Sequence, residues 1–456
     1  MIITPEEVIS AAREVGFLKR NGGKIDPFDF LMALVFRMSQ SFPPALNTII
    51  SFLKKPVSRS GLHQKFTDKA VSFFRRCLEL IMVKQLMQSE IIDTSLLEHF
   101  KRVLVVDSSS WDISSLLAKI FPGSGGSAST ANCKLQFIYD YKSGTIISVE
   151  DRKGIEPDQS YSQNLGTIAQ EGDLFLFDLG YWSFITFYTI GLVRGYFVSR
   201  FNTIVNFWYC SGEDDETKLD LGEFLKKQTF NNIEIKGFIK DQRGRRVDSR
   251  LIAFRAPQAV ADERRRKLRG QAKKKGRTPS EKSLQLCDWS LFITNSSEEQ
   301  IPGKMIRTIY RVRWCVELIF KSWKSVLRID KTNVKVNANR LKCELYAKLI
   351  FAVITHTIHN HLQSYLWSKE RRELSFDKLW KFMVSHNESF HKAIKKSIKY
   401  FSNKINSIVG KIIKECEKYH HKSRKTTLQM IDEGIGDPEP IKIDLNMDYQ
   451  CVETLA

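Results

Sequence analysis

The stretch RVLVVDSSSWD (residues 102–112) decides the fold, because there the chain changes from helical to strand-like patterning. Its β-branched apolar run ends in Asp107 and predicts a buried strand. The run DLFLFD (173–178) ends in Asp178 and predicts a neighbouring central strand. Strand ends of α/β sheets commonly supply site residues, so the two acids are candidate metal ligands. A turn or a helix N-cap is the simpler reading of Asp112, Asp140 and Asp173.

The segments that follow residue 112 extend this core. CKLQFIYDYKSGTIISVED (133–151) predicts a hairpin around a KSG turn, and YFVSRF (196–201) predicts another strand. Helices are expected within 157–172 and from about Ser183. This order of elements predicts a mixed α/β sheet. Residues 202–296 look strand-rich and irregular. They contain RRRKLRGQAKKKGR (264–277), with nine basic residues and no acid, which is interpreted as a solvated loop or a nucleic-acid contact.

Helical periodicity dominates both ends of the chain. FDFLMALVFRM (28–38) and KAVSFFRRCLELIMVKQLM (69–87) space apolar residues by three and four. Between them, Ser58 is placed to start a short helix that would present Arg59 and Lys65 to phosphates or base edges, as in a helix-turn-helix unit. An ordinary exposed helix is the alternative. Residues 297 to about 425 also look helical, and the last 31 residues hold seven acids against Lys442 alone.

Composition limits the class of protein. The 456 residues carry a net charge of +20, which favours polyanions and above all nucleic acid as partner. A basic soluble enzyme or an anionic membrane surface is the alternative. No C-x-x-C pair occurs among the eight Cys, which argues against a zinc ribbon or a disulfide framework. No apolar run is long enough to span a membrane, so we expect a cytoplasmic, nucleoid-associated protein without a membrane partner.

The stretch YRVRWCVELIFKSWK (310–324) holds polar side chains within an apolar helix pattern. As one helix, it would place Tyr310, Arg313, Glu317 and Lys324 within an arc of about 60° beside the buried face. A phosphodiester with metal ions would use all four, through carboxylate ligation, a bidentate Arg, a Lys charge and a phenol hydroxyl. An exposed i,i+4 ion pair between Arg313 and Glu317 is the alternative.

These four residues, spaced Y-x2-R-x3-E-x6-K and preceded by two strand-end acids, resemble the bacterial insertion-sequence DDE transposases of the YREK type, family four. The similarity covers about residues 50 to 420. It implies an RNase H-like core in which Asp107, Asp178 and Glu317 are catalytic and bind two Mg²⁺ ions, with Mn²⁺ as a substitute. Tyr310, Arg313 and Lys324 would then hold phosphates beside the scissile bond.

The resemblance also implies a reaction and its partners. Family members cut transposon ends through hairpin intermediates and join the 3′ ends to target DNA, as homodimers in a synaptic complex on terminal inverted repeats. Trp289 matches the base-stacking Trp of the family, or else fills the core of the insertion. Trp314 is a second candidate wedge. Arg200 is a candidate DNA contact or a partner of an acid. A nuclease without strand transfer, and a non-catalytic DNA-binding regulator, are the alternatives.

On this reading the chain divides into six parts: a helical DNA-recognition domain (1–100), the first part of the catalytic core (101–201), a strand-rich insertion with a basic loop (202–296), the second part of the core with the Tyr-Arg-Glu-Lys helix (297–335), a helical region suited to dimerisation (336–425) and an acidic tail (426–456).

Overall fold

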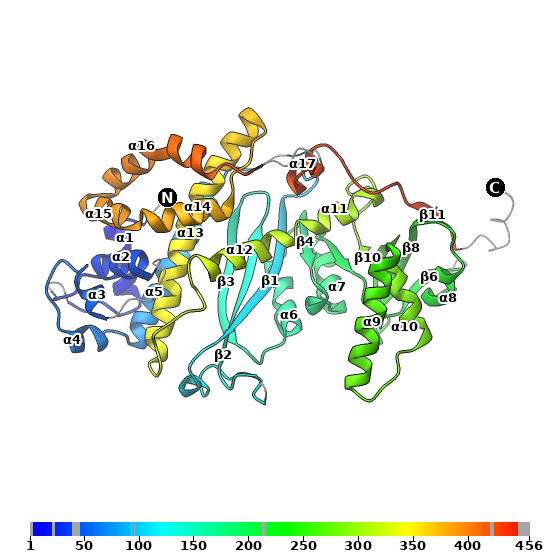
Figure 1. Ribbon diagram of the computed structural model, residues 1–456, viewed down its shortest axis with the longest axis horizontal. Coiled ribbons are helices and arrows are strands. Elements are labelled where there is room, and N and C mark those ends of the chain that lie inside the picture. Colours follow the sequence, from blue (N-terminus) through cyan, green and yellow to red (C-terminus); the bar gives the residue numbers. More distant parts are fainter. Residues whose placement is uncertain are drawn as a thin grey trace. The chain divides into compact units, whose positions relative to one another are not determined.

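The computed structural model describes residues 3–20, 23–38, 46–92, 94, 96–126, 128–211, 215–419 and 424–445 (Figure 1). The chain forms two compact units, each assembled from segments that are distant in sequence. Unit 1 takes its described residues from 1–93, 107–156 and 315–424, and unit 2 from 94–106, 157–314 and 425–456. Each unit is described by itself below.

Hydrogen bonds link the strands in the order β3-β2-β1-β4-β5-β10-β9-β8-β6-β7, and β11 pairs with β8. The strands are β1 (Arg102–Asp112), β2 (Asn132–Asp140), β3 (Thr145–Lys153), β4 (Asp173–Phe177), β5 (Tyr196–Arg200), β6 (Phe207–Cys210), β7 (Glu216–Leu219), β8 (Asn232–Lys240), β9 (Arg246–Arg255), β10 (Trp289–Thr294) and β11 (Ile441–Ile443). Parallel and antiparallel pairs both occur. The predicted α/β class with a mixed sheet is therefore confirmed, and the sheet is consistent with the predicted RNase H-like core.

The parallel part of the sheet lies in unit 2. There β4 pairs with β5 on one side and with the first half of β1 on the other, in a register that runs from Arg102↔Asp173 to Val105↔Leu176. The prediction that the runs ending in the two candidate acids form neighbouring strands is thus confirmed. Asp173 closes the turn before β4, as predicted, since its carboxylate accepts from the Gln170 amide at 2.8 Å; the same carboxylate is fully buried and ion-paired with Arg102 at 2.5 Å.

The helices of unit 2 are α6 (Asp158–Ile168), η2 (Leu179–Tyr181), α7 (Phe184–Leu192), α8 (Leu221–Lys226), α9 (Gln258–Lys274), α10 (Glu281–Gln285), η3 (Leu286–Asp288), η4 (Gly303–Met305), α11 (Ile306–Arg311) and α17 (Thr427–Asp432). The expectation that the basic block is a loop was wrong over most of its length, since 264–274 belong to α9. Arg, Lys, Gln, Ala and Leu are good helix formers. Their helix propensity therefore favours a helix here despite the repulsion between the basic side chains.

The acidic end of the chain is not a separate tail over its described part. Residues 441–443 form β11, which adds to β8 in parallel. Asp437 is ion-paired with Arg307, and Glu439 with Lys304 at 3.4 Å. Backbone pairing and opposite charge therefore attach this segment to the basic residues of unit 2, as far as Leu445. The rest of the predicted tail lies outside the described residues.

Unit 1 combines the β2–β3 hairpin with helices from both ends of the chain. Its helices are α1 (Pro5–Glu14), α2 (Pro27–Met38), α3 (Leu46–Ile50), α4 (Arg59–His63), α5 (Asp68–Met87), η1 (Ser115–Leu117), α12 (Trp314–Ser325, whose first residue belongs to unit 2), α13 (Ala338–Glu370), α14 (Phe376–Ser385), α15 (Asn387–Lys396) and α16 (Ile398–Cys416). The 33-residue α13 is buried on most sides and packs against α2 and α5. Ser58 caps α4 as predicted, through its hydroxyl and the Gly61 amide.

The stretch 310–324 is not one helix, which corrects the expected geometry. α11 ends at Arg311 and α12 begins at Trp314. Between them the amides of Val312 and Arg313 donate to the carbonyls of Ile309 and Tyr310, three residues back instead of four. Such bonds tighten the backbone and end the regular α-helical rotation, so a single helical wheel cannot relate Tyr310 to the residues of α12.

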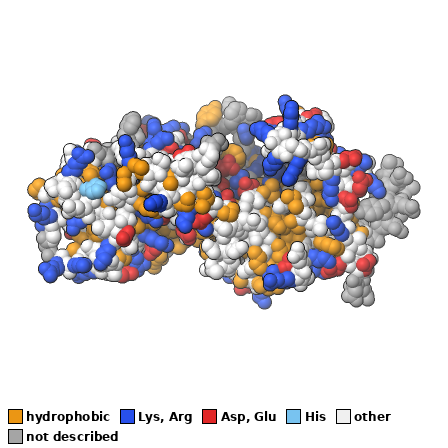
Figure 2. All heavy atoms as spheres, turned by 90° about the horizontal axis from the view of Figure 1, so that it is seen from below, with side chains coloured by type: hydrophobic (Ala, Val, Ile, Leu, Met, Phe, Trp, Pro, Cys, Tyr) orange, Lys and Arg blue, Asp and Glu red, His pale blue; other side chains and the backbone are white. Residues whose placement is uncertain are grey.

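No helix of the described chain is long and apolar enough to cross a membrane. Lys and Arg side chains are spread over the face of the molecule shown in Figure 2, as expected from the net charge.

Candidate active site

Asp107 lies in the middle of β1 and not at its end, because the strand continues to Asp112. The serines after Asp107 keep extended backbone while exposure increases along the strand. Asp107 is half-buried; its carboxylate accepts from the Ser108 amide at 2.8 Å, and its carbonyl accepts from the Gln136 side chain at 3.2 Å. Backbone and side chain are therefore both held in place in unit 1.

Helix α12 carries Glu317 and Lys324 on one face, since seven residues are close to two full turns. Its apolar face packs on β2, where the Phe137 ring lies 5.5 Å from Phe320 and 5.1 Å from Trp323. The Lys324 ammonium donates to the carbonyl of Ser110 in β1 at 3.1 Å. Unit 1 thus brings the second half of β1, with Asp107, and the polar face of α12 together.

Asp178 directly follows β4 in unit 2, as predicted, and precedes the short helix η2. Tyr310, in α11, belongs to the same unit. Burial raises the pKa of the Tyr310 phenol to about 12; the cations Arg313 and Arg200 oppose this shift, and Asp178 adds to it. Arg313, Arg200 and Asp178 therefore each lie within electrostatic reach of the Tyr310 phenol.

The Tyr310 hydroxyl is buried and makes no regular hydrogen bond with the described residues, although the Arg313 guanidinium is near enough to lower the pKa of the phenol as a hydrogen-bond donor would. The ring is held by Phe292 of β10, at 5.2 Å between centroids, and the Arg313 guanidinium lies 5.8 Å from the ring centre. A buried hydroxyl without a partner is costly in a folded protein. The hydroxyl is therefore suited to meet a ligand oxygen at this point.

Arg200 ends β5, opposite Phe292 of β10. The described residues offer it no acid within ion-pair distance, so the alternative of an Arg200–acid pair has no support in them. Sequence reasoning did not single out Arg264, whose pKa is lowered by burial and by the charge of Arg200. Its only sequence signal was membership in the basic block.

Trp289 begins β10 and is 5% exposed. The Arg255 guanidinium lies 4.5 Å from its ring centre, and Arg264 donates to its carbonyl at 3.0 Å. The indole is thus packed inside the insertion. Trp314, in contrast, is 57% exposed at the start of α12.

Arg59 and Lys65 are exposed at the two ends of the α4 region in unit 1. No described partner occupies either side chain, so both are available to a ligand. Their distance in sequence from the other candidate residues leaves them as a separate surface feature.

Candidate metal ligands are divided between the units. Asp107 and Glu317 belong to unit 1 and Asp178 to unit 2, and among the described residues no three His, Cys, Asp or Glu side chains form a cluster suited to a metal ion. The donor set of three carboxylates is nevertheless the chemistry that hard divalent cations prefer.

His356 of α13, which lies near His359 and His361 in sequence, is not on a helix surface. That ring is 1% exposed in the core of unit 1, 4.5 Å from Phe376 and 5.9 Å from Trp323. Burial lowers its pKa well below the usual value and keeps it neutral. Its surroundings are aromatic, so the ring acts as a core residue.

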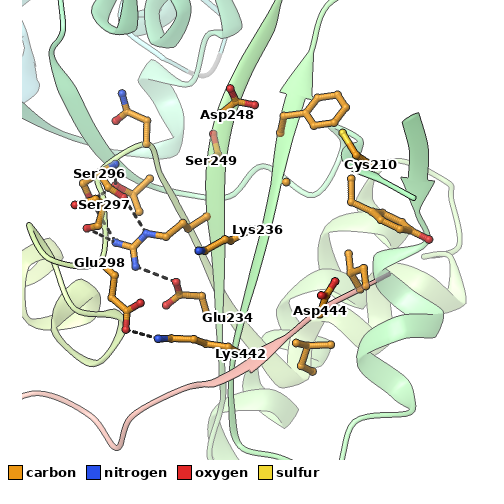
Figure 3. Close-up of a pocket in the computed structure, with 18 of the residues that line it drawn as sticks. Cys210, Glu234, Lys236, Asp248, Ser249, Ser296, Ser297, Glu298, Lys442 and Asp444 are labelled. Carbon is orange, nitrogen blue, oxygen red and sulfur yellow. Dashed lines mark hydrogen bonds and ion pairs between the residues drawn. The ribbon is translucent and has the colours of Figure 1, made fainter. Parts of the chain in front are cut away.

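A pocket of about 760 Å³ lies elsewhere in unit 2, beside β8, β9 and β11 (Figure 3). Arg250 is buried in its wall, where it pairs with Glu234 at 3.0 Å and donates to the carbonyls of Ser296, Ser297 and Ile301. Lys442 of β11 reaches Glu298 at 2.6 Å. These bonds hold the loop after β10 and the chain end in place. None of the predicted site residues lines this pocket.

Comparisons with known proteins show the family to which this chain is similar. Residues 98–354, more than half of the chain, match the family model described as transposase DDE domain. The transposase for insertion sequence element IS231E of Bacillus thuringiensis subsp. finitimus is 27% identical over 450 residues, which cover 94% of this chain and 93% of that protein. For IS231F of subsp. israelensis the identity is 29%, with 82% and 81% covered.

More distant proteins also align. The transposase for IS1151 of Clostridium perfringens is 24% identical, with 93% of each chain covered. A solved piggyBac transposase synaptic complex with hairpin DNA has a TM-score of 0.42 and 12% identity, over 88% of this chain and 82% of that chain. That score is too low to support an inference about fold or function.

Proposed function

The chain belongs to the transposase DDE-domain family, and we propose that it moves an insertion sequence by cutting its DNA ends and joining them to target DNA. Transposition of DNA is the activity that defines the family. The finer steps are our proposal: binding of terminal inverted repeats, cleavage through hairpin ends, and transfer of the 3′ ends by a homodimer. The insertion-sequence relatives align over nearly their whole length, which supports the choice.

We propose that Asp107, Asp178 and Glu317 are the catalytic acids and hold two Mg²⁺ ions, or Mn²⁺ in their place. The register of β1 and β4 supports the first two. The last recorded pair is Val105↔Leu176, and each Asp follows its member of that pair by two residues, on the same strand face. Bound metal would activate the attacking oxygen and stabilise the leaving oxygen of an in-line displacement.

The remaining polar residues position the DNA. The Tyr310 hydroxyl and the guanidinium of Arg313 bind non-bridging phosphate oxygens, one as a neutral donor and the other as a bidentate cation. Lys324 adds a point charge beside β1. The single observation that supports this role is the charge around the buried Tyr310 hydroxyl, which makes no regular hydrogen bond and lies within electrostatic reach of Arg313, Arg200 and Asp178. A phosphodiester satisfies the hydroxyl and neutralises the cations.

Hairpin formation needs a base to leave the stack and find an aromatic surface. Trp314 is exposed and suited to that role as it stands. Trp289 could stack on a base only if its ring left its contact with the Arg255 guanidinium. Arg59 and Lys65 are proposed contacts to the terminal repeats, because both are exposed beside a capped short helix. Arg200 is proposed as a further phosphate contact near Tyr310.

The test compares cleavage with binding for wild type, Asp107→Asn, Asp178→Asn and Glu317→Gln, on duplexes that carry the DNA flanking the gene. Each substitution keeps the shape of the side chain and removes its negative charge. We expect cleavage with Mg²⁺ to fall at least about 100-fold, the range for losing one transition-state contact, with binding retained. Normal cleavage by any of the three variants would remove that residue from the site.

The second candidate is a metal-dependent nuclease of the same core without strand transfer. Joined products separate the two functions: the proposed transposase inserts a pre-cut 3′ end into a plasmid, whereas a nuclease only degrades it. Glu223→Gln, on the exposed side of α8 in unit 2, is the matched control for the loss of one carboxylate charge.

A further inference from the structure

Helix α9 is attached to unit 2 along one side. Arg264 donates to the carbonyls of Cys287 and Trp289, at 3.2 and 3.0 Å, and to the Ser290 hydroxyl at 2.9 Å. Arg265 is ion-paired with Asp288. Ala261 is fully buried on the same side. These contacts fix the first half of the helix to the η3–β10 segment.

An exposed side of α9 carries Arg266, Arg269 and Lys273, which we call the basic stripe. At 100° per residue the three lie within an arc of about 60°, and they span about 10 Å along the axis. All three are exposed. None forms an ion pair with a described residue.

The close ion pairs of the α9 acids are with residues outside the stripe, and only Glu263 also feels the charge of a stripe residue, Arg266. Asp262 pairs with Arg265 at 2.9 Å, and Glu263 with Lys267 at 2.7 Å. Like charges three and four residues apart repel and destabilise a helix. Arg266–Arg269 and Arg269–Lys273 are such pairs. The free protein retains this repulsion, and a bound polyanion would relieve it and stabilise the helix.

Gly270 is an independent second observation. It lies on the same side as the stripe, between Arg269 and Lys273 in sequence, and has ordinary helical surroundings. A Cβ built there would meet no atom within 4 Å. Glycine inside a helix is unfavourable relative to alanine, and here neither packing nor a positive φ requires it. A missing side chain on an exposed, positively charged face lets another backbone approach closely.

We propose that the basic stripe binds the sugar–phosphate backbone of duplex DNA and that Gly270 is the point of closest approach. The inference rests on the proposed function only in taking DNA as the polyanion. The stripe belongs to the same piece of unit 2 as the candidate site, since Arg264 joins α9 to Trp289, and β10 holds Tyr310 through Phe292. Phosphate contacts carry no sequence information, so the stripe grips DNA of any sequence.

The experiment measures the association constant against salt concentration for the full chain, by fluorescence anisotropy. One probe is a 30-base-pair duplex of arbitrary sequence, and the other carries the flanking repeat of the gene. For the triple variant Arg266→Gln, Arg269→Gln and Lys273→Gln, we expect the slope of log K against log salt to become less steep by about 2 to 3, because each neutralised phosphate contributes about 0.9. The change is expected on both probes.

The matched control is Lys218→Gln, Lys226→Gln and Lys227→Gln, which removes three exposed charges from β7 and α8 of the same unit. Its slope is expected to stay close to that of the wild type. An equal change in both triple variants would mean that only net charge matters and would overturn the proposal. So would an unchanged slope in the stripe variant.

Gly270→Ala is expected to change thermal stability and DNA affinity in opposite directions. We expect the thermal midpoint to rise, because the helix gains propensity, while affinity for both duplexes falls at least threefold. Unaltered affinity would overturn the role given to Gly270. The two proposals fail differently: a wild type that binds no duplex DNA contradicts the proposed function, whereas a wild type that binds and cleaves, with a stripe variant of normal slope, contradicts only this inference.

Discussion

Two buried polar regions of the molecule differ in how their polar atoms are satisfied. In α13, Glu344 accepts from Arg340 at 2.7 Å, and the Lys348 ammonium donates to the carbonyls of Arg328 and Lys331 at 2.6 and 2.8 Å. At Tyr310 the hydroxyl is buried and makes no regular hydrogen bond. In the first region the polar groups have their hydrogen-bond partners in the free protein, and we call it the complete region. In the second, the incomplete region, the hydroxyl gains a partner only from a ligand. Charge alone would not have separated them.

A third case shows that an unpartnered polar atom is insufficient evidence by itself. Both ring nitrogens of His356 also lack partners, yet its neighbours are aromatic rings, and its pKa is lowered by burial. Tyr310 differs because cations and a carboxylate surround it. The ligand site is identified by the surrounding charge and not by the missing hydrogen bond.

The largest expected effect comes from a substitution that disrupts the complete region in α13. Glu344→Ala removes the partner of Arg340 and leaves buried Lys348, whose pKa burial already lowers to about 8, without its nearest acid. Loss of one partner of a buried charge network costs about 3–5 kcal/mol. Chemical denaturation should show a lower midpoint with an unchanged slope. Glu415→Ala, on an exposed helical pair, is the control; equal stability of the two variants would contradict the distinction drawn here.

Tyr310→Phe tests the incomplete region in the opposite sense. It removes a hydroxyl that has no partner in the free protein, so stability should be unchanged or slightly higher. Strand cleavage should fall about 10- to 100-fold, within the range of one lost contact to the reacting phosphate. Thermal unfolding and single-turnover cleavage are measured on the same sample. A variant that unfolds early yet cleaves normally would reverse the assignment.

The last prediction concerns the buried histidines of unit 1. Burial lowers the pKa of His391 to about 3 and that of His356 well below its usual value. The unfolded chain binds a proton near pH 6.5 and the folded chain does not, so stability is present above that pH and is lost as pH falls from about 6.5 toward 3. The expected loss is about 1.4 kcal/mol per pH unit for each ring.

Thermal midpoints between pH 7 and pH 4.5 measure this loss. His391→Phe should flatten the profile, because it keeps the stacked ring contact with Phe36 at 5.6 Å and removes the titrating group. An identical profile for wild type and variant would show that other groups control the pH dependence.

The sequence by itself indicated the class of this protein. The apolar runs before Asp107 and Asp178 predicted the neighbouring strands, because residue type and periodicity are local properties. The spacing of Tyr310, Arg313, Glu317 and Lys324 resembled that of insertion-sequence transposases, and the match to the transposase DDE domain then showed the family. The predicted helices at 28–38 and 69–87 were found for the same reason.

Tertiary structure decided what local patterns do not contain. It placed Asp107 within its strand, interrupted the helix at Val312, buried Trp289 and His356, and added the β11 segment to the sheet. It also left the Tyr310 hydroxyl without a partner. Burial and hydrogen-bond satisfaction depend on residues distant in sequence, so only the folded chain separates a side chain held by its neighbours from one that meets a ligand.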